Sequence, residues 1–199
     1  MVAGKGAYPR KTRAARVVKP LTPAQLEELA LAYVARFATT AKGLQKYCRR
    51  KLRERGWEDA EEGAAAPDID ALVERFVRNG YVNDAEFARA KSGSLLRRGY
   101  GERRVGQALT AAGVAEEDRA HIAEGEARHA ALRLAEKRRF GPFGADGAPP
   151  DDRALREKQV AAMLRAGHRM DAARELVHAP DADAAREWAT ALDDKEDDA

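Results

Sequence analysis

The chain has 199 residues and a formal net charge of +3, and its 44% hydrophobic and 35% charged residues are typical of a globular protein. No apolar run approaches the ~18 residues that a membrane span requires, and the N-terminal segment lacks the apolar stretch of a secretory signal. A single cysteine, Cys48, excludes an internal disulfide and a cysteine zinc site, so we expect a cytoplasmic protein. Alanine occurs 43 times, whereas valine, isoleucine and threonine together occur 19 times, which favours helices over a sheet.

Helix caps and apolar spacing predict an all-α chain. Thr22, Pro23 and Gln25 form a capping box with proline at the first helical position, so the first helix is expected to begin here. The stretches 58–67 and 140–150 are predicted loops. The predicted helices cover 23–37, 44–55, 69–78, 83–98, 102–112, 115–125, 126–139, 152–166 and 170–178, with a further short helix over 184–192.

The middle helices share one feature that indicates an internal repeat. Each ends in a glycine four residues after an apolar residue, at Gly56, Gly113 and Gly167, and these glycines are 57 and 54 residues apart. Short helices bury their apolar faces by stacking on neighbours, so we predict about three three-helix repeats, nine helices in all, in an elongated, curved array. The predicted repeats are 21–82, 83–125 and 126–180, preceded by a disordered basic arm over 1–20 and followed by an acidic tail over 181–199.

Basic side chains gather in two places within the predicted repeats. Residues 42–55 hold seven basic residues and one acid, and four arginines flank the turn at 99–101. Such clusters suit acidic protein surfaces or DNA phosphates, and equally a solvated helix face, so both interpretations stay open. The candidate partner-binding residues are Lys46, Arg49, Arg50, Arg53, Arg97, Arg98, Arg103 and Arg104.

No motif predicts catalysis. The two serines, Ser92 and Ser94, lie in no G-x-S-x-G elbow, no phosphate-binding loop is present, and the four histidines show no metal-ligand spacing. Cys48 lies on an apolar stripe, which indicates a buried small hydrophobe, although neighbouring Arg49 and Arg50 would favour a thiolate. We therefore expect a protein that is not an enzyme and that has no cofactor and no metal.

A more specific pattern runs from residue 76 to residue 113. A hydrophobic helix is followed by Gly80, Tyr81, Val82, Asn83, Asp84, Phe87 and Ala88, and a basic stretch is followed by Gly101, Arg104, Val105, Leu109 and Gly113. This pattern closely resembles that of the RecX family, bacterial regulators of the RecA recombinase, and a weaker match covers about 24–178. The sequence departs from the family pattern at the Gly/Pro insert and at His168, where an aromatic residue is usual. We expect Tyr81 and Phe87 in the core and Asp84 as a first-turn acid beside the cap Asn83.

The resemblance implies tandem three-helix repeats and a function without catalysis. It implies a monomeric clamp that lies in the groove of the RecA–DNA filament and damps ATP hydrolysis, strand exchange and co-protease activity, affecting DNA repair and the SOS response. A curved array suits this task because several modest contacts with one polymer combine. Weak DNA contact is compatible with this function. The alternatives are a sequence-nonspecific nucleic-acid-binding helical-repeat protein, acting through the basic arm and helices, and an unrelated helical scaffold.

Overall fold

The computed structural model describes residues 19–58 and 67–192, and within these ranges it contains nine α-helices and no strand beyond an isolated bridge between Leu21 and Trp57. The all-α prediction is confirmed. The helices are α1 (Pro23–Val34), α2 (Ala41–Arg55), α3 (Ile69–Arg78), α4 (Asp84–Arg97), α5 (Glu102–Ala112), α6 (Glu124–Arg138), α7 (Arg153–Ala166), α8 (Met170–His178) and α9 (Ala182–Thr190), with 3₁₀ helices η2 (Glu116–Asp118) and η3 (Gly141–Phe143). The predicted basic arm up to residue 18, most of the 58–67 loop and the last seven residues of the acidic tail lie outside the described residues.

Short polar side chains explain where most of these helices begin. The side chain of each capping residue accepts a hydrogen bond from a backbone N–H of the first turn, a group that has no partner within the helix. Thr22 and Gln25 form the predicted capping box at α1. The other side-chain caps are Thr40 for α2, Asp68 for α3, Asn83 for α4, Asp152 for α7 and Asp181 for α9.

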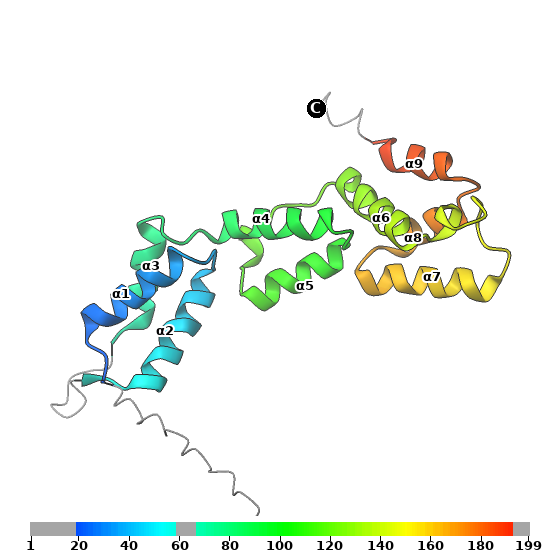
Figure 1. The fold of residues 1–199 in the computed structure, drawn as a ribbon. Helices are drawn as coiled ribbons and strands as arrows, with labels where there is room; N and C mark the ends of the chain where they lie inside the picture. Colours follow the sequence, from blue (N-terminus) through cyan, green and yellow to red (C-terminus); the bar gives the residue numbers. More distant parts are fainter. Residues whose placement is uncertain (1–18, 59–66, 193–199) are drawn as a thin grey trace, which may run out of the picture.

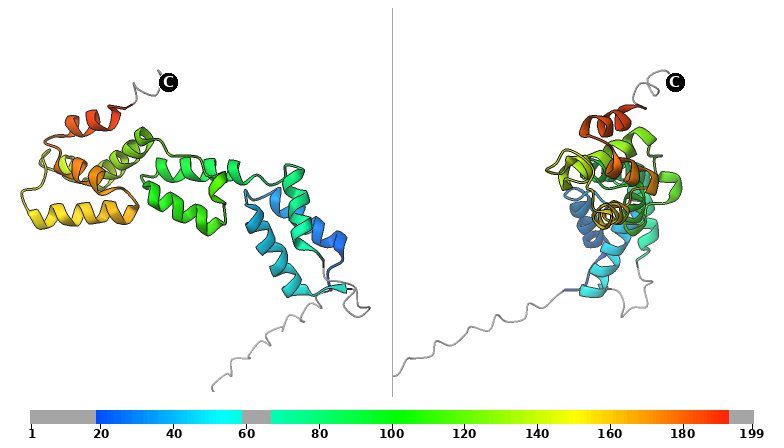
Figure 2. Two further views of the ribbon diagram at one scale, coloured as in Figure 1. Left: turned by 180° about the vertical axis from the view of Figure 1, so that it is seen from behind. Right: turned by 90° about the vertical axis from the view of Figure 1, so that its right-hand side faces the viewer.

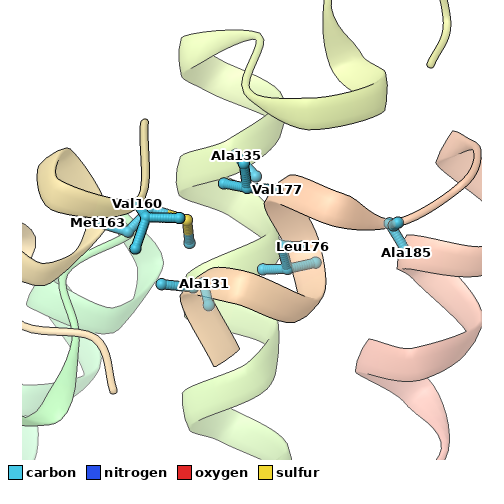
Figure 3. Packing of buried hydrophobic residues seen from close by; sticks show 9 residues of the cluster. Ala131, Ala135, Val160, Met163, Leu176, Val177 and Ala185 are labelled. Atoms are coloured by element: carbon cyan, nitrogen blue, oxygen red, sulfur yellow. The ribbon is translucent and has the colours of Figure 1, made fainter. Parts of the chain in front are cut away.

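The helices form three groups that follow one another along the molecule, giving an elongated array (Figures 1 and 2). Repeat 1 consists of α1–α3, repeat 2 of α4, α5 and η2, and repeat 3 of α6–α9. Each repeat has its own buried apolar cluster, centred on Leu44 and Phe76 in repeat 1 and on Leu96 and Leu109 in repeat 2. In repeat 3, alanines of α6 leave room for residues of the other helices, including Met163 and Leu176 (Figure 3). The elongated array of helical repeats is therefore confirmed.

The middle helices α7, α5 and α2 follow one another end to end along one side of the array (Figure 1). At each junction the C-terminus of one helix meets the N-terminus of the next. This arrangement lets the carbonyl groups left over at one helix end face the N–H groups left over at another. We call the α5–α2 junction joint 1 and the α7–α5 junction joint 2.

Joint 1 is made by side chains. The hydroxyl of Thr40 donates a hydrogen bond to the carbonyl oxygen of Ala112 at 2.7 Å, at the end of α5. The backbone N–H of Ala41 donates to the carboxylate of Asp84 at 2.8 Å, at the start of α4. Asp84 is thus more than the first-turn acid that the sequence predicts, because it ties repeat 2 to the start of α2.

Joint 2 is made mainly by the backbone. The N–H of Gly101 donates to the carbonyl of Ala166 at 3.0 Å, and the N–H of Arg103 donates to the carbonyl of Gly167 at 3.2 Å. The cap of α5 is Gly101, which has no side-chain cap, so the end of α7 takes the place of one. The imidazole Nε2 of buried His168 lies 3.0 Å from the carbonyl oxygen of Gly99, which adds a third connection.

The prediction of a sixth helix over 115–125 is wrong. Only the 3₁₀ turn η2 forms there, α6 begins at Glu124, and Gly125 is buried inside α6 instead of ending a helix. Arg119 offers a physical reason, because its guanidinium donates to the carbonyl of Val114 at 2.8 Å and holds this segment in a non-helical path. The predicted helices 69–78, 102–112 and 170–178 have the bounds of α3, α5 and α8. The remaining predicted helices are present with shifted ends, and the short last helix is α9.

Candidate partner-binding surfaces

The first predicted basic cluster lies on the exposed side of α2. Leu44 and Cys48 face the core of repeat 1, which leaves Lys46, Arg49 and Arg53 at helical spacing on the solvent side. Lys46 and Arg53 form no close ion pair among the described residues, although Arg53 is near enough to Glu54 to contribute to the lowered pKa of that carboxyl, after Lys51 and Arg50. We call the exposed residues Lys46, Arg49, Arg50 and Arg53 the α2 basic face.

The remaining two cations of the α2 basic face are weakly paired. Arg49 lies 3.2 Å from Asp70 of α3, with side chains 53% and 60% exposed, and Arg50 lies 3.6 Å from Glu54. Surface pairs of this kind contribute about 0–1 kcal/mol, so a strongly acidic partner can replace them at little cost. The guanidinium of Arg50 also lies 5.5 Å from the ring of Tyr47, which is stacked on Tyr33. Aromatic packing therefore supports this part of the face.

The second predicted cluster surrounds the turn between α4 and α5, at joint 2. Arg97, Arg98, Arg103 and Arg104 are all exposed, and none forms an ion pair with a carboxylate that the structure describes. The guanidinium of Arg98 lies over the Tyr100 ring at 5.3 Å. Arg103 donates to the carbonyl oxygen of Leu164 in α7, so this residue also has a structural part in joint 2.

The two basic clusters therefore belong to different repeats. The α2 basic face is on repeat 1, whereas the second cluster, which we call the joint 2 arginines, lies where repeats 2 and 3 meet. The structure thus does not gather the eight residues into one pocket. The two clusters are separate exposed cationic surfaces, and the repeats that carry them follow one another along the elongated body (Figure 2).

A groove of about 380 Å³ lies between repeats 2 and 3. Arg128 is held on its wall, donating to Glu124 at 2.6 Å and to the carbonyl of Trp188 at 3.2 Å, with its guanidinium 4.7 Å from the Trp188 ring. The acids Glu102, Glu124 and Asp171 belong to the first turns of α5, α6 and α8, where they favour the helix dipoles. The lining residues are Glu102, His121, Ile122, Glu124, Ala127, Arg128, Gly167, His168, Arg169, Asp171, Ala172, Glu175 and Trp188.

The structure shows how the single cysteine, Cys48, is placed. Burial raises the pKa of the Cys48 thiol to about 11, so the neighbouring arginines do not produce a thiolate and the residue is a buried small hydrophobe as predicted. Within the described ranges no three His, Cys, Asp or Glu side chains come together as a metal-binding group. In the same ranges, no helix has both the length and the apolar character needed to cross a membrane.

Comparison with known proteins adds to these observations. A family model described as RecX, second three-helix domain, matches residues 83–121. The regulatory protein RecX of Myxococcus xanthus (strain DK1622) is 32% identical over 176 residues, covering 84% of this chain and 92% of that protein. The chain belongs to the RecX family. This confirms the resemblance carried by the pattern at 76–113.

In this RecX family member the matched domain coincides with repeat 2. Its first two elements are α4 and α5, and its third is the short turn η2. Two expectations for the RecX pattern are corrected or refined here. Tyr81 is 54% exposed, with its ring tilted against Phe76, so its assignment to the core is wrong. Phe87 is half-buried against the core of repeat 2.

The sequence patterns did not reveal which residues of this RecX family member join one repeat to the next. Thr40, Asp84 and His168 come from segments far apart in sequence, and each contributes a hydrogen bond between repeats. The signal in the sequence was weak, since a threonine or aspartate beside a helix start is explained by local capping alone. Only a long-range hydrogen bond in the structure distinguishes a residue that caps its own helix from a residue that also links two repeats.

Proposed function

We propose that this RecX family protein is a non-enzymatic, monomeric regulator in the cytoplasm that binds along the groove of the RecA–DNA filament. It lowers the recombinase, ATPase and co-protease activities of that filament, and through them affects DNA repair and the SOS response. The proposal is supported by the family and by the regulatory protein RecX of M. xanthus. The observation that carries it is that the two sets of exposed cations belong to different repeats of one elongated body.

A contact made at two places is stronger than either contact alone. Once the α2 basic face has bound one site, the joint 2 arginines are held near a second site at high effective concentration. Modest surface charges are then sufficient for binding to a repeating polymer, whereas they would bind an isolated protomer weakly. Exposed cations such as Lys46 and Arg53 suit acidic side chains or DNA phosphates.

The decisive experiment measures single-stranded-DNA-dependent ATP hydrolysis by the cognate recombinase. The protein is added substoichiometrically to preformed filaments at one fixed salt concentration, with and without a large excess of free DNA. Because the proposed target is the filament, we expect hydrolysis to fall in both cases. Inhibition that disappears with excess DNA would instead support the second candidate, a sequence-nonspecific nucleic-acid binder that masks DNA.

A pair of variants tests the α2 basic face. Lys46→Gln/Arg53→Gln removes two exposed cations that form no close ion pair among the described residues, and we expect it to weaken inhibition several-fold. The matched control Arg78→Gln/Arg89→Gln removes the same charge from exposed residues that are paired with Glu74 and Glu86. If both variants weaken inhibition equally, net charge and not the α2 basic face determines binding.

A further inference from the structure

The three repeats are not joined equally. The buried cluster of repeat 1 and the half-buried residues that pack on it all lie between Leu21 and Val82. The buried cluster of repeat 2, in contrast, includes Ala130 of α6, a helix of repeat 3. Repeats 2 and 3 therefore share part of an apolar core, whereas repeats 1 and 2 do not.

The backbones of repeats 2 and 3 are also in close contact. Gly99 packs so tightly on α6 that a Cβ at this position would lie 3.1 Å from the backbone nitrogen of Leu134. A Cβ on Gly101 would lie 2.5 Å from the backbone nitrogen of His168. Main-chain groups are fixed by their own helices, so contacts between them leave little freedom for one repeat to rotate against the other.

Joint 1 has a different construction. Besides the connecting chain, its hydrogen bonds need the side chains of Thr40 and Asp84, and the stem of Lys42 covers Gly113. Side chains change rotamer far more easily than helices change shape. Partial burial raises the pKa of Asp84, and the hydrogen bond from the Ala41 N–H opposes this shift.

We propose that the array has a hinge at joint 1. Repeats 2 and 3 move as one rigid unit, and repeat 1, with the α2 basic face, swings about the contact formed by Thr40 and Asp84. The distance between the α2 basic face and the joint 2 arginines then varies with the hinge angle. The hydrogen bonds at joint 1 favour one orientation of repeat 1 relative to repeat 2. This inference concerns the protein alone and does not depend on the proposed function.

Distance distributions between pairs of spin labels test the hinge directly. In a Cys48→Ala background, labels are placed on cysteines that replace exposed residues Glu28 (α1), Gln107 (α5) and Arg174 (α8). The Glu28–Gln107 pair spans joint 1, and the Gln107–Arg174 pair spans joint 2. We expect the first distribution to be at least twice as wide as the second. Equal widths, or a wider distribution across joint 2, would overturn the proposal.

Variants of Asp84 test which contact holds the hinge. Asp84→Ala removes the acceptor for the Ala41 N–H and should widen the Glu28–Gln107 distribution further, with the Gln107–Arg174 distribution unchanged. Asp84→Asn keeps an acceptor oxygen and should restore most of the original width. The matched control Glu86→Ala changes an acid in the same first turn of α4 that bonds only to nearby residues. Circular dichroism checks that each variant keeps its helices.

The results of the variants separate a hinge from general loosening. If Asp84→Ala widens both distributions equally, or if Glu86→Ala acts as strongly, the Asp84 contact has no special place at joint 1 and the proposal fails. All measurements use the free protein. A failed filament experiment therefore leaves this inference intact, and a failed hinge leaves the proposed function intact.

Discussion

Gly101 and Gly167 are in direct backbone contact across joint 2, although they are far apart in sequence. A Cβ on Gly167 would lie 3.0 Å from the carbonyl oxygen of Gly101, and a Cβ on Gly101 would overlap the carbonyl group of Gly167. Gly167 also has φ +99°, in the left-handed region that favours glycine. Two helix ends can therefore meet here only because neither position carries a side chain.

Replacement of Gly101 by alanine should separate these helix ends. We expect Gly101→Ala to lower the free energy of unfolding by about 1–3 kcal/mol, the usual cost of overpacking, as measured by urea unfolding followed by circular dichroism. Gly106→Ala is the matched control, because Gly106 lies inside α5 with nothing within 4 Å of its added Cβ. It should instead raise stability by about 0.5–1 kcal/mol. Equal effects of the two variants would contradict this account of joint 2.

The stability of the protein should depend on pH through His168. Burial lowers the pKa of this imidazole below its ordinary value of 6.5, and the carbonyl of Gly99 opposes the shift only in part. Below pH 6.5 the unfolded chain therefore binds a proton more readily than the folded chain does. We expect the free energy of unfolding to fall as the pH is lowered from 6.5 to the pKa of His168 in the folded protein. Above pH 6.5 this residue should not contribute to the pH dependence of stability.

His168→Gln provides the comparison for this titration. The glutamine amide can donate to the Gly99 carbonyl but does not titrate, so the variant should lose the part of the pH dependence just below 6.5. Glu102, Asp171 and Arg169 line the same groove and are unchanged in the variant. Identical pH profiles for the two proteins would show that His168 makes no contribution.

Arg103 and Arg104 should differ in their effect on stability. Arg103 donates to the Leu164 carbonyl across joint 2, and Arg104 makes no such side-chain contact among the described residues. We expect Arg103→Gln to cost about 0.5–1.5 kcal/mol, a typical net value for one hydrogen bond, and Arg104→Gln to be nearly neutral. Thermal unfolding of the two variants measures the difference. Arg104→Gln is thus the cleaner probe of partner binding.

Cys48 should resist alkylation in the folded protein. Its side chain is fully buried and its thiol has a pKa of about 11, so at pH 8 both access and the thiolate fraction are low. Reaction with iodoacetamide, followed by mass spectrometry, should be at least tenfold slower in buffer than in denaturant. Rapid modification of the folded protein would show that the core of repeat 1 opens readily.

Sequence patterns predict the structural elements that depend on residues close together along the chain. They do not predict features that depend on contacts between residues far apart in the sequence. The ends of α5 and α7 at Gly113 and Gly167 follow from the left-handed conformation that glycine adopts after a helix. Gly125 looks the same in sequence but is buried in the first turn of α6, where a helix begins instead of ending. The hydrophobic ring of Tyr81 suggests burial, yet the turn that follows α3 leaves it exposed.

For the candidate surfaces too, exposure could be predicted from the sequence but long-range contacts could not. Helical spacing correctly predicts that Lys46 and Arg53 are exposed, because the opposite side of α2 is apolar. Spacing does not reveal that Arg103 reaches across to α7, or that Asp84 reaches back to α2. These contacts depend on how one repeat is placed against the next, which local patterns do not encode.

The end-to-end order of α7, α5 and α2 gives the array a direction. Every junction joins a carbonyl end to an amide end, so the two extremities of this line are chemically different, one at Asp152 and the other at Gly56. Rotating the molecule end over end does not reproduce the same surface. A polymer that has its own polarity, such as a helical filament, therefore meets two inequivalent docking orientations and can accept one while rejecting the other.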